Sequence, residues 1–272
     1  MRETDFAWVR EVVRSRAAIV LDDRKRYLVE SRLGPLAREH GFDGISELVL
    51  AIRSGRRREL EEAVVDAMTT NETSFFRDGV PWQAMREHVL PDIIERRRTK
   101  RRLRVWSAAC STGQEPYTLS MLLHEHYPQV MDWDLEILAT DISPSVLQKA
   151  RDGVYAPTEV GRGLELPLRN KYFSPADGGR WAIEPRLQKP IRFERLNLAA
   201  PWPPFVGQFD IIFVRNVLIY FDVPTKKDIL SRMEKHLAPD GYLLLGSGET
   251  TLNLGLGLRR RQAERAWFYQ HG

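Results

Sequence analysis

The sequence predicts an α/β protein, in which a doubly wound parallel sheet with a small antiparallel insert follows an all-helical N-terminal domain. Three observations predict this fold. Apolar residues recur at helical spacing through residues 1–70. From Arg102 onward, short apolar strands alternate with helical segments, as in doubly wound sheets that bind ligands at the carboxyl ends of their strands. Between residues 157 and 196, glycines, prolines and short apolar stretches interrupt this alternation and predict the insert.

The bulk properties are those of an ordinary soluble protein. A chain of 272 residues can form one large or two smaller domains. No apolar run approaches the roughly 20 residues of a membrane helix, and residues 1–16 are charged throughout, so we expect neither a membrane span nor a secretory signal. The single cysteine, Cys110, excludes an internal disulfide and indicates a reducing compartment. We therefore expect a cytoplasmic monomer without a bound metal.

The placement of charge excludes one class of partner. The net charge is +4, and the basic surplus lies in residues 67–104, which contain nine Lys and Arg against five Asp and Glu. A nucleic-acid-binding protein usually spreads a basic stripe over a whole domain. We therefore expect no nucleic-acid partner, and we interpret the runs at residues 96–98 and 100–102 as a solvated helix end and loop.

Residues 1–70 predict a small helical bundle. One helix spans residues 24–39, where Pro35 is expected to end or kink it near Gly34; another spans residues 56–68. The apolar positions that define the other helices and the inner face of the last one are Phe6, Val9, Val12, Val13, Ala17 and Val20; Ile45, Leu48, Val49 and Ile52; and Leu60, Ala63, Val64 and Ala67. The segment 24–38 also has a basic face, formed by Arg24, Lys25, Arg26, Arg32 and Arg38. Such a face is either an ordinary solvated surface or a docking surface.

Residues 71–101 predict a linker and a connecting helix. The stretch TTNETSFFRD begins at Thr69, and its threonines and Asn71 favour helix caps over helix interiors. Phe75 and Phe76 then precede Arg77, so an apolar pair lies beside a fixed positive charge. This is either an anchoring aromatic pair after a cap or one wall of a site. Residues 82–96 predict an amphipathic helix.

Residues 102–272 predict the sheet and its helices. We expect four strands. The first two end at Trp106 and at Asp141, and the other two span residues 209–214 and 242–245, the last after a turn at residues 239–241. Expected helices span residues 117–126, 145–151 and 226–237, and Ser143-Pro144 signals the start of the second. We place the short stretches 181–183 and 191–193 in the insert.

Three features near the first strands indicate a ligand site. Residues 107–113 are nearly all small, which lets a ligand approach the backbone and the amino end of the next helix, although such a turn can also serve packing alone. Asp141 follows the second strand, where a carboxylate can accept hydrogen bonds from ribose hydroxyls or cap the next helix. Glu115 lies in the first helical turn, where it could face a cationic ligand.

The residues distinguish between two cofactors. A dinucleotide site needs a glycine-rich turn for a diphosphate, whereas this turn ends with one glycine followed by Glu115. A carboxylate repels a diphosphate but attracts the sulfonium or amino group of S-adenosylmethionine. S-adenosylmethionine is therefore the expected cofactor.

The segment FDIIFVRNVLIYFD, residues 209–222, supplies the second group of site residues. Its strand ends at Val214 and delivers Arg215, Asn216 and Tyr220 to the same edge of the sheet. Enzymes that methylate amino groups commonly have an Asn or Asp followed by two prolines here, whereas in this chain Val217 and Leu218 follow Asn216 and there is no proline. An ionised acceptor such as a carboxylate needs no general base, only donors that aim it. Arg77, Arg215 and Tyr220 are the available donors.

The chain resembles the chemotaxis-receptor glutamate O-methyltransferases, the CheR family. The resemblance covers nearly the whole chain and depends on the ordered motifs TNETSFFRD, SAACSTGQEPYTLSMLL, LATDIS, RLNL, FDIIFVRNVLIYFD and LAPDGYLLLGSGET. It implies a Rossmann-like methyltransferase domain that transfers methyl groups from S-adenosylmethionine, with S-adenosylhomocysteine as product, to glutamates on the cytoplasmic helices of chemoreceptors. Gln114, Val214 and the GSGET stretch depart from the usual residues, and none removes a matched cofactor contact.

The resemblance also implies roles for individual residues. Arg77 and Tyr220 would lie beside the reacting methyl group, and the basic face of residues 24–38 would dock on the acidic receptor helices. The insert resembles the part that docks a receptor's C-terminal peptide in some members. The implied cofactor contacts are Asn71, Thr73, Arg77, Glu115, Asp141, Asn197, Leu198, Arg215 and Asn216.

Two other classes of protein remain open. A methyltransferase acting on another protein, on RNA or on a small molecule would share the cofactor site but lack the paired TNETSFFRD and RNVLIY elements. A non-catalytic S-adenosylmethionine sensor would keep Asp141 and Glu115 but could lose Arg77 and Tyr220.

Overall fold

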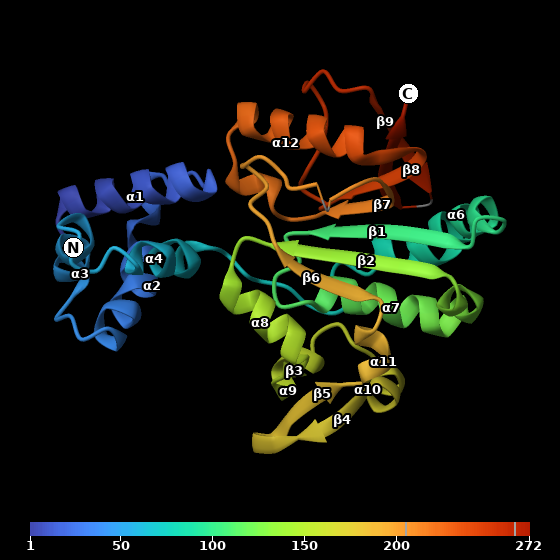
Figure 1. The fold of residues 1–272 in the computed structure, drawn as a ribbon, viewed down its shortest axis with the longest axis horizontal. Coiled ribbons are helices and arrows are strands. Elements are labelled where there is room, and N and C mark those ends of the chain that lie inside the picture. The colour runs from blue at the N-terminus through green and yellow to red at the C-terminus, as the bar shows by residue number, and fades with distance from the viewer. Residues whose placement is uncertain (205, 264) are drawn as a thin grey trace. The chain divides into compact units, whose positions relative to one another are not determined.

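The computed structural model describes residues 1–204, 206–263 and 265–272, which form two compact units (Figure 1). The first unit comprises Met1–Thr70 together with Tyr220–Lys226. The second comprises Asn71–Ile219 and Lys227–Gly272. Among the described residues, every helix is too short or too polar to span a membrane.

The first unit is a helical bundle, as the apolar spacing predicts. Its helices are α1 (Glu3–Ala17), α2 (Arg26–Glu39), α3 (Ile45–Arg53) and α4 (Leu60–Met68). The predicted helical positions Phe6, Val9, Val13, Leu48 and Val64 are buried in one core. Val20 was expected to continue the first helix, and this is wrong. The chain leaves the helix at Ala18, whose φ is 55°, and the Val20 N–H donates to the carbonyl of Tyr220, 3.0 Å away.

Pro35 was expected to end or kink this helix near Gly34. Helix α2 continues through Pro35 and ends only at Glu39, so the first of these alternatives is wrong. Two local features explain this. Gly34 has no Cβ to clash with the proline ring, which is the clash that normally excludes helical backbone before a proline. Leu33 and Ala37 are fully buried on either side of Pro35, so core packing compensates for the hydrogen bond that proline cannot donate.

The connecting helix of the second unit contains a wide turn that the sequence pattern does not predict. It consists of α5 (Val80–Ala84), a π-helical turn (Met85–Val89) and α6 (Leu90–Arg97). The π-helical turn ends two residues before Pro91, which has no N–H to donate to the preceding turn. Trp82, Met85, Leu90 and Ile93 bury the apolar face of this helix in the core.

The main sheet has seven strands in the order β6-β2-β1-β7-β8-β10-β9. Its first five strands are parallel, and β10 is antiparallel to both β8 and β9. Helices α7 and α8 lie on one side of the sheet and α12 on the other, so the sheet is doubly wound (Figure 1). The strands are β1 (Arg102–Ala108), β2 (Asp134–Asp141), β6 (Ile191–Arg195), β7 (Phe209–Val214), β8 (Leu237–Leu245), β9 (Leu258–Ala263) and β10 (Ala266–His271). The helices are α7 (Gln114–His126), α8 (Pro144–Asp152) and α12 (Val223–His236).

The insert is a three-stranded antiparallel sheet in the order β3-β5-β4, with short helices around it. Its elements are β3 (Val154–Tyr155), α9 (Pro157–Val160), α10 (Leu166–Tyr172), β4 (Phe173–Ala176), β5 (Arg180–Ile183) and α11 (Pro185–Gln188). One strand was assigned wrongly. Residues 191–193 belong to β6, which pairs with β2 in the main sheet, because Ile191 and Phe193 pack against main-sheet residues there.

Strand β8 begins earlier than predicted. The expected turn at residues 239–241 lies inside the strand, where a register shift between Phe209 and Ile211 of β7 absorbs the extra residues. A Cβ on Gly241 would come within 2.8 Å of the Asp210 carbonyl, so glycine permits this close approach of β7 and β8. The carboxyl ends of β1, β2, β6, β7 and β8 then lie along one edge of the sheet.

Candidate active site

The turn after β1 is sharply folded and ends at the amino terminus of α7. Ala109, Ser111 and Gly113 all have positive φ, at 57°, 51° and 93°. A Cβ on Gly113 would come within 3.0 Å of both Ala150 and Tyr117, so only glycine fits here. The small residues therefore create the tight turn itself, and the following helical N–H groups face the edge of the sheet.

Asp141 holds this turn from the end of β2. Its Oδ2 accepts from the Ser111 N–H at 2.8 Å and its Oδ1 from the Ser143 N–H at 3.0 Å. The alternative that Asp141 caps α8 is wrong. The cap is Ser143, whose Oγ accepts from the Val146 N–H. Ser111 in turn donates its Oγ proton to the carbonyl of Asn71, at 2.8 Å. Asp141 thus connects the turn to the start of the TNETSFFRD segment.

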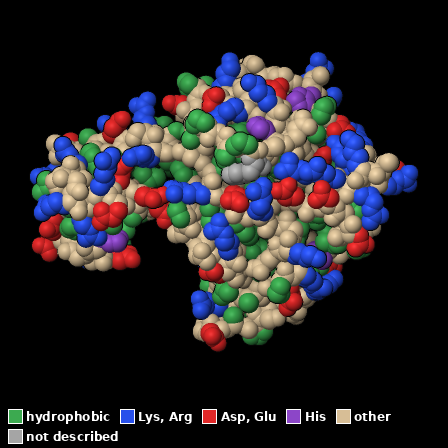
Figure 2. All heavy atoms as spheres, in the orientation of Figure 1, with side chains coloured by type: hydrophobic (Ala, Val, Ile, Leu, Met, Phe, Trp, Pro, Cys, Tyr) green, Lys and Arg blue, Asp and Glu red, His purple; other side chains and the backbone are tan. Residues whose placement is uncertain are grey.

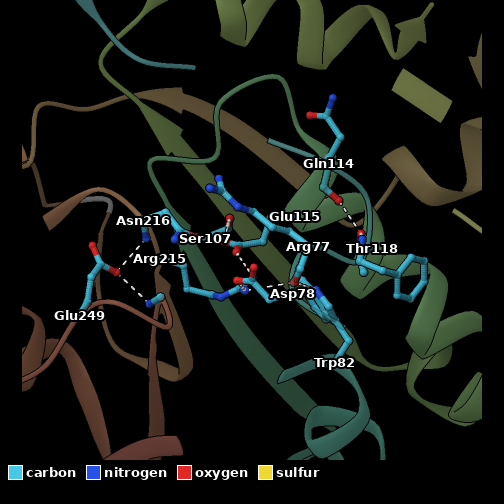
Figure 3. A network of polar contacts seen from close by, with 12 residues as sticks. Arg77, Asp78, Trp82, Ser107, Gln114, Glu115, Thr118, Arg215, Asn216 and Glu249 are labelled. Carbon is cyan, nitrogen blue, oxygen red and sulfur yellow. Dashed lines mark hydrogen bonds and ion pairs between the residues drawn. The ribbon is translucent and has the colours of Figure 1, made fainter. Parts of the chain in front are cut away.

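Glu115, in the first turn of α7, is the central acid of the site (Figure 3). Its Oε1 accepts from Ser107 Oγ at 2.8 Å, and its Oε2 lies 3.1 Å from Arg215 Nη1. Burial raises the pKa of this carboxyl, while Arg215 and the Ser107 hydroxyl act in the opposite direction. The ionised carboxylate is therefore less stable here than in water, and an additional cation beside it would lower its free energy.

Arg215 connects three segments at the end of β7. Only 2% of its side chain is exposed. Besides Glu115, its guanidinium contacts Asp78 Oδ2 at 2.8 Å and the Arg77 carbonyl at 3.1 Å, and it lies 5.7 Å from the Trp82 ring (Figure 3). Its Nε is buried and has no partner among the described residues. A buried donor of this kind indicates a missing acceptor at the site.

Asn216 follows in a left-handed conformation, with φ of 59°. Its side-chain Oδ1 is also buried without a partner in the described part of the chain. The turn that starts here binds a residue that sequence reasoning missed, Glu249, which accepts backbone N–H groups from residues 216, 217 and 218 at 2.7–2.9 Å. The only sequence signal was an acid in the GSGET stretch after β8.

The other predicted cofactor residues lie on segments around this centre. Arg77 is partly exposed, and its Nη1 donates to the Glu72 carbonyl at 2.7 Å. Asn71 and Thr73 are partly buried in the same segment. The loop after β6 holds Asn197, whose Oδ1 accepts from the Ala199 N–H at 2.9 Å. It also holds Leu198, whose carbonyl accepts from Arg232 Nη2 at 2.6 Å.

Two groups of predicted residues lie in the first unit. Tyr220 begins the second segment of that unit. Within the basic face, Arg32 is half-buried and donates to the carbonyls of Met68 and Thr69 at 2.8 and 2.7 Å, so it satisfies the open end of α4. Arg26 pairs with Glu3, the exposed Arg24 pairs with Asp22, and Arg38 is also exposed. Sequence alone could not distinguish these structural arginines from surface ones.

The donor set fits S-adenosylmethionine, which carries a sulfonium, an ammonium, a carboxylate and ribose hydroxyls. Glu115, Asp141 and the unpartnered Asn216 Oδ1 suit its cations and hydroxyls, and the unpartnered Arg215 Nε suits its carboxylate. No group of three or more potential metal ligands occurs among the described residues. A doubly wound sheet with this set of groups at its carboxyl edge defines an S-adenosylmethionine-dependent methyltransferase.

Comparison with known proteins identifies the family. Residues 4–69 match the model of the CheR methyltransferase all-alpha domain, and residues 71–263 match that of the CheR methyltransferase SAM-binding domain. Chemotaxis protein methyltransferase 1 of Pseudomonas aeruginosa is 43% identical over 253 residues, covering 92% of this chain and 91% of that protein. Chemotaxis protein methyltransferase Cher2 of Pseudomonas putida is 42% identical over 248 residues, 90% of each chain. The chain belongs to the CheR family, and it is a protein methyltransferase whose cofactor is S-adenosylmethionine.

Proposed function

We propose that this enzyme methylates the side-chain carboxylates of glutamates on the cytoplasmic helices of chemoreceptors and thereby sets sensory adaptation. The observation that carries the proposal is the partly exposed guanidinium of Arg77, whose backbone carbonyl accepts a hydrogen bond from Arg215 Nη2 and so joins its segment to the site. A site with fixed cations suits an acceptor that is already ionised. The relatives that cover most of the chain are named chemotaxis protein methyltransferases, which supports the same acceptor.

The roles of the residues follow from their surroundings. The cofactor supplies an activated methyl group on a sulfonium. Glu115, Asp141, Asn216 and the other predicted contacts, Asn71, Thr73, Asn197, Leu198 and Arg215, hold and orient that cofactor. Arg77 Nη1 donates a hydrogen bond to the backbone carbonyl of Glu72. The remaining N–H groups of the guanidinium orient the acceptor carboxylate. Tyr220 positions the acceptor or the sulfur side of the cofactor.

No general base is required, because a glutamate acceptor is ionised at neutral pH. The chain must instead exclude water and aim the acceptor oxygen, since both partners lose charge as the ester forms. Burial of Glu115 and Arg215 indicates a site with little water. A dry, preorganised site of this kind favours the less charged products.

We further propose that the basic face of residues 24–38 docks on acidic receptor helices. Arg38 is the best placed of its residues, because it is exposed and the other three arginines of this face already bind groups of the helical unit. On the face of this unit shown in Figure 2, basic and acidic side chains are mixed, so docking would depend on a few charges. Raising the salt concentration should weaken it.

The proposal is tested by transfer of a radiolabelled methyl group to a panel of receptor cytoplasmic fragments. A base-labile methyl ester on glutamate is the expected product. Arg77→Ala should reduce turnover by at least about 100-fold, since orienting contacts of this kind contribute several kcal/mol. The matched control is Arg98→Ala, which removes an exposed arginine of similar size at the end of α6.

Three outcomes would contradict the proposal. Wild-type turnover in Arg77→Ala would remove the assigned role of that residue. Label found in RNA or small molecules but in none of the receptor fragments would indicate another acceptor. Cofactor binding without transfer to any acceptor would indicate a sensor.

A further inference from the structure

The carboxylate of Glu249 accepts four backbone N–H groups. Oε1 binds those of Val217 and Leu218 at 2.9 and 2.7 Å, and Oε2 binds those of Asn216 and Gly246 at 2.7 and 2.8 Å. The donors come from the turn after β7 and from the end of β8, so one side chain joins the exits of two adjacent strands (Figure 3). Converging N–H groups form a concave site that favours an anion.

The fit around this carboxylate is tight. A Cβ on Gly246 would lie 2.7 Å from Glu249 Oε2 and 2.8 Å from both the backbone N and the Nδ2 of Asn216. Asn216 itself has a left-handed backbone, which is unfavourable for a residue with a Cβ unless its surroundings hold it there. The four hydrogen bonds to Glu249 supply that restraint.

The restrained residue carries an unused polar group. The Asn216 Oδ1 is buried and has no donor among the described residues, although its backbone N–H is bound by Glu249. A buried carbonyl oxygen without a donor is unfavourable and indicates that a ligand N–H or O–H completes it. Glu249 has no comparable unused atom, because each of its oxygens accepts two N–H groups.

We infer that Glu249 is a positioning residue, which fixes the turn at residues 216–218 so that the Asn216 carboxamide presents its oxygen to an N–H group of the cofactor. The inference depends on the placement of S-adenosylmethionine at Asn216 and not on the identity of the methyl acceptor. Glu249 acts through Asn216 and touches neither the cofactor nor the acceptor. Gly246 leaves the space that the arrangement needs.

The test is calorimetric titration of the full chain with S-adenosylhomocysteine, at a temperature where circular dichroism shows each variant to be folded. Glu249→Gln has the same shape but replaces one acceptor oxygen with an NH₂ group, which faces two backbone donors. We expect the dissociation constant to rise by roughly 10- to 100-fold, the equivalent of losing one or two hydrogen bonds to a charged group. Glu249→Asp keeps both acceptor oxygens and should recover part of the affinity. The matched control is Glu47→Gln, which removes a carboxylate that binds the backbone N–H of Asp43 in the helical unit and should leave the affinity unchanged.

A double-mutant cycle separates positioning from a general structural role. Asn216→Ala removes the carboxamide, and adding Glu249→Gln to it should weaken binding by less than about threefold more, because residues that act as one unit are non-additive. Additive losses would overturn the inference. So would a Glu249→Gln variant that melts at a lower temperature but binds with wild-type affinity when folded. Tight binding by the wild type without methyl transfer to any receptor fragment would contradict the proposed function and leave the evidence for Glu249 intact.

Discussion

Arg215 Nη1 lies 3.1 Å from Glu115 Oε2, and this ion pair joins the end of β7 to the first turn of α7. The two residues of this pair differ in how well their charges are compensated. Arg215 has a second acid, Asp78, at 2.8 Å, whereas the pKa of Glu115 is raised by burial despite the arginine beside it. The carboxylate of Glu115 therefore retains a net attraction for a further positive charge, which the cofactor can provide.

Replacing Glu115 by Gln should affect stability and binding in opposite directions. A raised pKa means that the neutral form fits the folded protein better than the charged form, and Gln resembles the neutral form. We expect an unchanged or higher melting temperature and an affinity for S-adenosylhomocysteine reduced by about tenfold or more, the loss of one charge-assisted contact. Differential scanning fluorimetry and calorimetric titration measure the two effects. A large fall in melting temperature would show that the ion pair is mainly structural.

The affinity for S-adenosylmethionine should rise with pH above 4.5, the ordinary pKa of a glutamate side chain. Because the folded pKa of Glu115 lies higher, part of the free protein carries a proton there that must leave when a cation binds beside it. Binding at pH 5 should therefore release protons, which is measurable as a dependence of the apparent enthalpy on the buffer. Glu115→Gln should abolish that dependence. A wild-type affinity that stays constant between pH 4.5 and neutrality would contradict the prediction.

A substitution in the insert should destabilise the second unit. Gly163 has φ of +81°, and a Cβ there would lie 1.9 Å from the carbonyl oxygen of Phe75, a backbone atom that cannot move without disturbing the TNETSFFRD segment. Gly163→Ala should cost about 2–4 kcal/mol of unfolding free energy, from backbone strain together with overpacking. Urea denaturation measures this loss of unfolding free energy. The control is Gly248→Ala, where a Cβ meets nothing within 4 Å; equal effects of the two would contradict the argument.

The grouping of several candidate site residues at one edge was predictable because they lie at or after strand ends. Asp141, Glu115 and Arg215 lie directly after or near the ends of β2, β1 and β7, and parallel strands bring their carboxyl ends to one edge whatever the side-chain details. Glu249 was not predictable in the same way. Its four donors are backbone groups, which have no sequence signature, and three of them lie more than 30 residues away.

The errors in the fold have a common physical basis, because in each case tertiary packing overrode a local signal. Pro35 predicts a helix end, but buried neighbours on both sides keep α2 helical. Residues 239–241 predict a turn, but close approach to β7 draws them into β8. Residues 191–193 look like part of the glycine-rich insert, and only pairing with β2 assigns them to the main sheet.

Cys110 should be chemically inert in the folded protein. Its thiol is fully buried, and burial raises its pKa far above the ordinary value, so very little reactive thiolate is present at neutral pH. A thiol reagent such as 5,5′-dithiobis(2-nitrobenzoate) should react at the rate of unfolding or local opening, and fully in urea. Because Cys110 is the only cysteine in the sequence, the signal needs no correction for other thiols. Rapid reaction of the native protein would show that the turn after β1 opens readily.

Acid stability should depend on an ion-pair cluster at the opposite edge of the sheet. Arg97 on α6 lies 2.6 Å from Asp210 on β7 and 2.5 Å from Asp240 on β8. The hydrogen bond from Arg97 is the main cause that lowers the pKa of Asp240 from 3.8 to about 2. A lowered carboxyl pKa stabilises the folded state above the ordinary value, and this contribution is lost as the pH falls from about 4 toward 2.

The variant Asp240→Asn isolates that contribution. It should lower stability at pH 6, where the wild-type carboxylate is ionised and bound. It should make much less difference near pH 2, where that carboxyl is about half protonated in the folded protein and most of its contribution is lost. Urea denaturation at a series of pH values measures the difference, which should shrink steadily below pH 4. Arg97 keeps Asp210 as a partner in this variant, so the guanidinium is not left without a counter-ion. The control is Asp228→Asn, which removes an exposed partner of Arg232 on α12 and should give a nearly constant difference of less than about 1 kcal/mol. If the stability difference between Asp240→Asn and the wild type stayed the same from pH 6 to pH 2, the charge of Asp240 would not contribute to the free energy of unfolding, and the prediction would be contradicted.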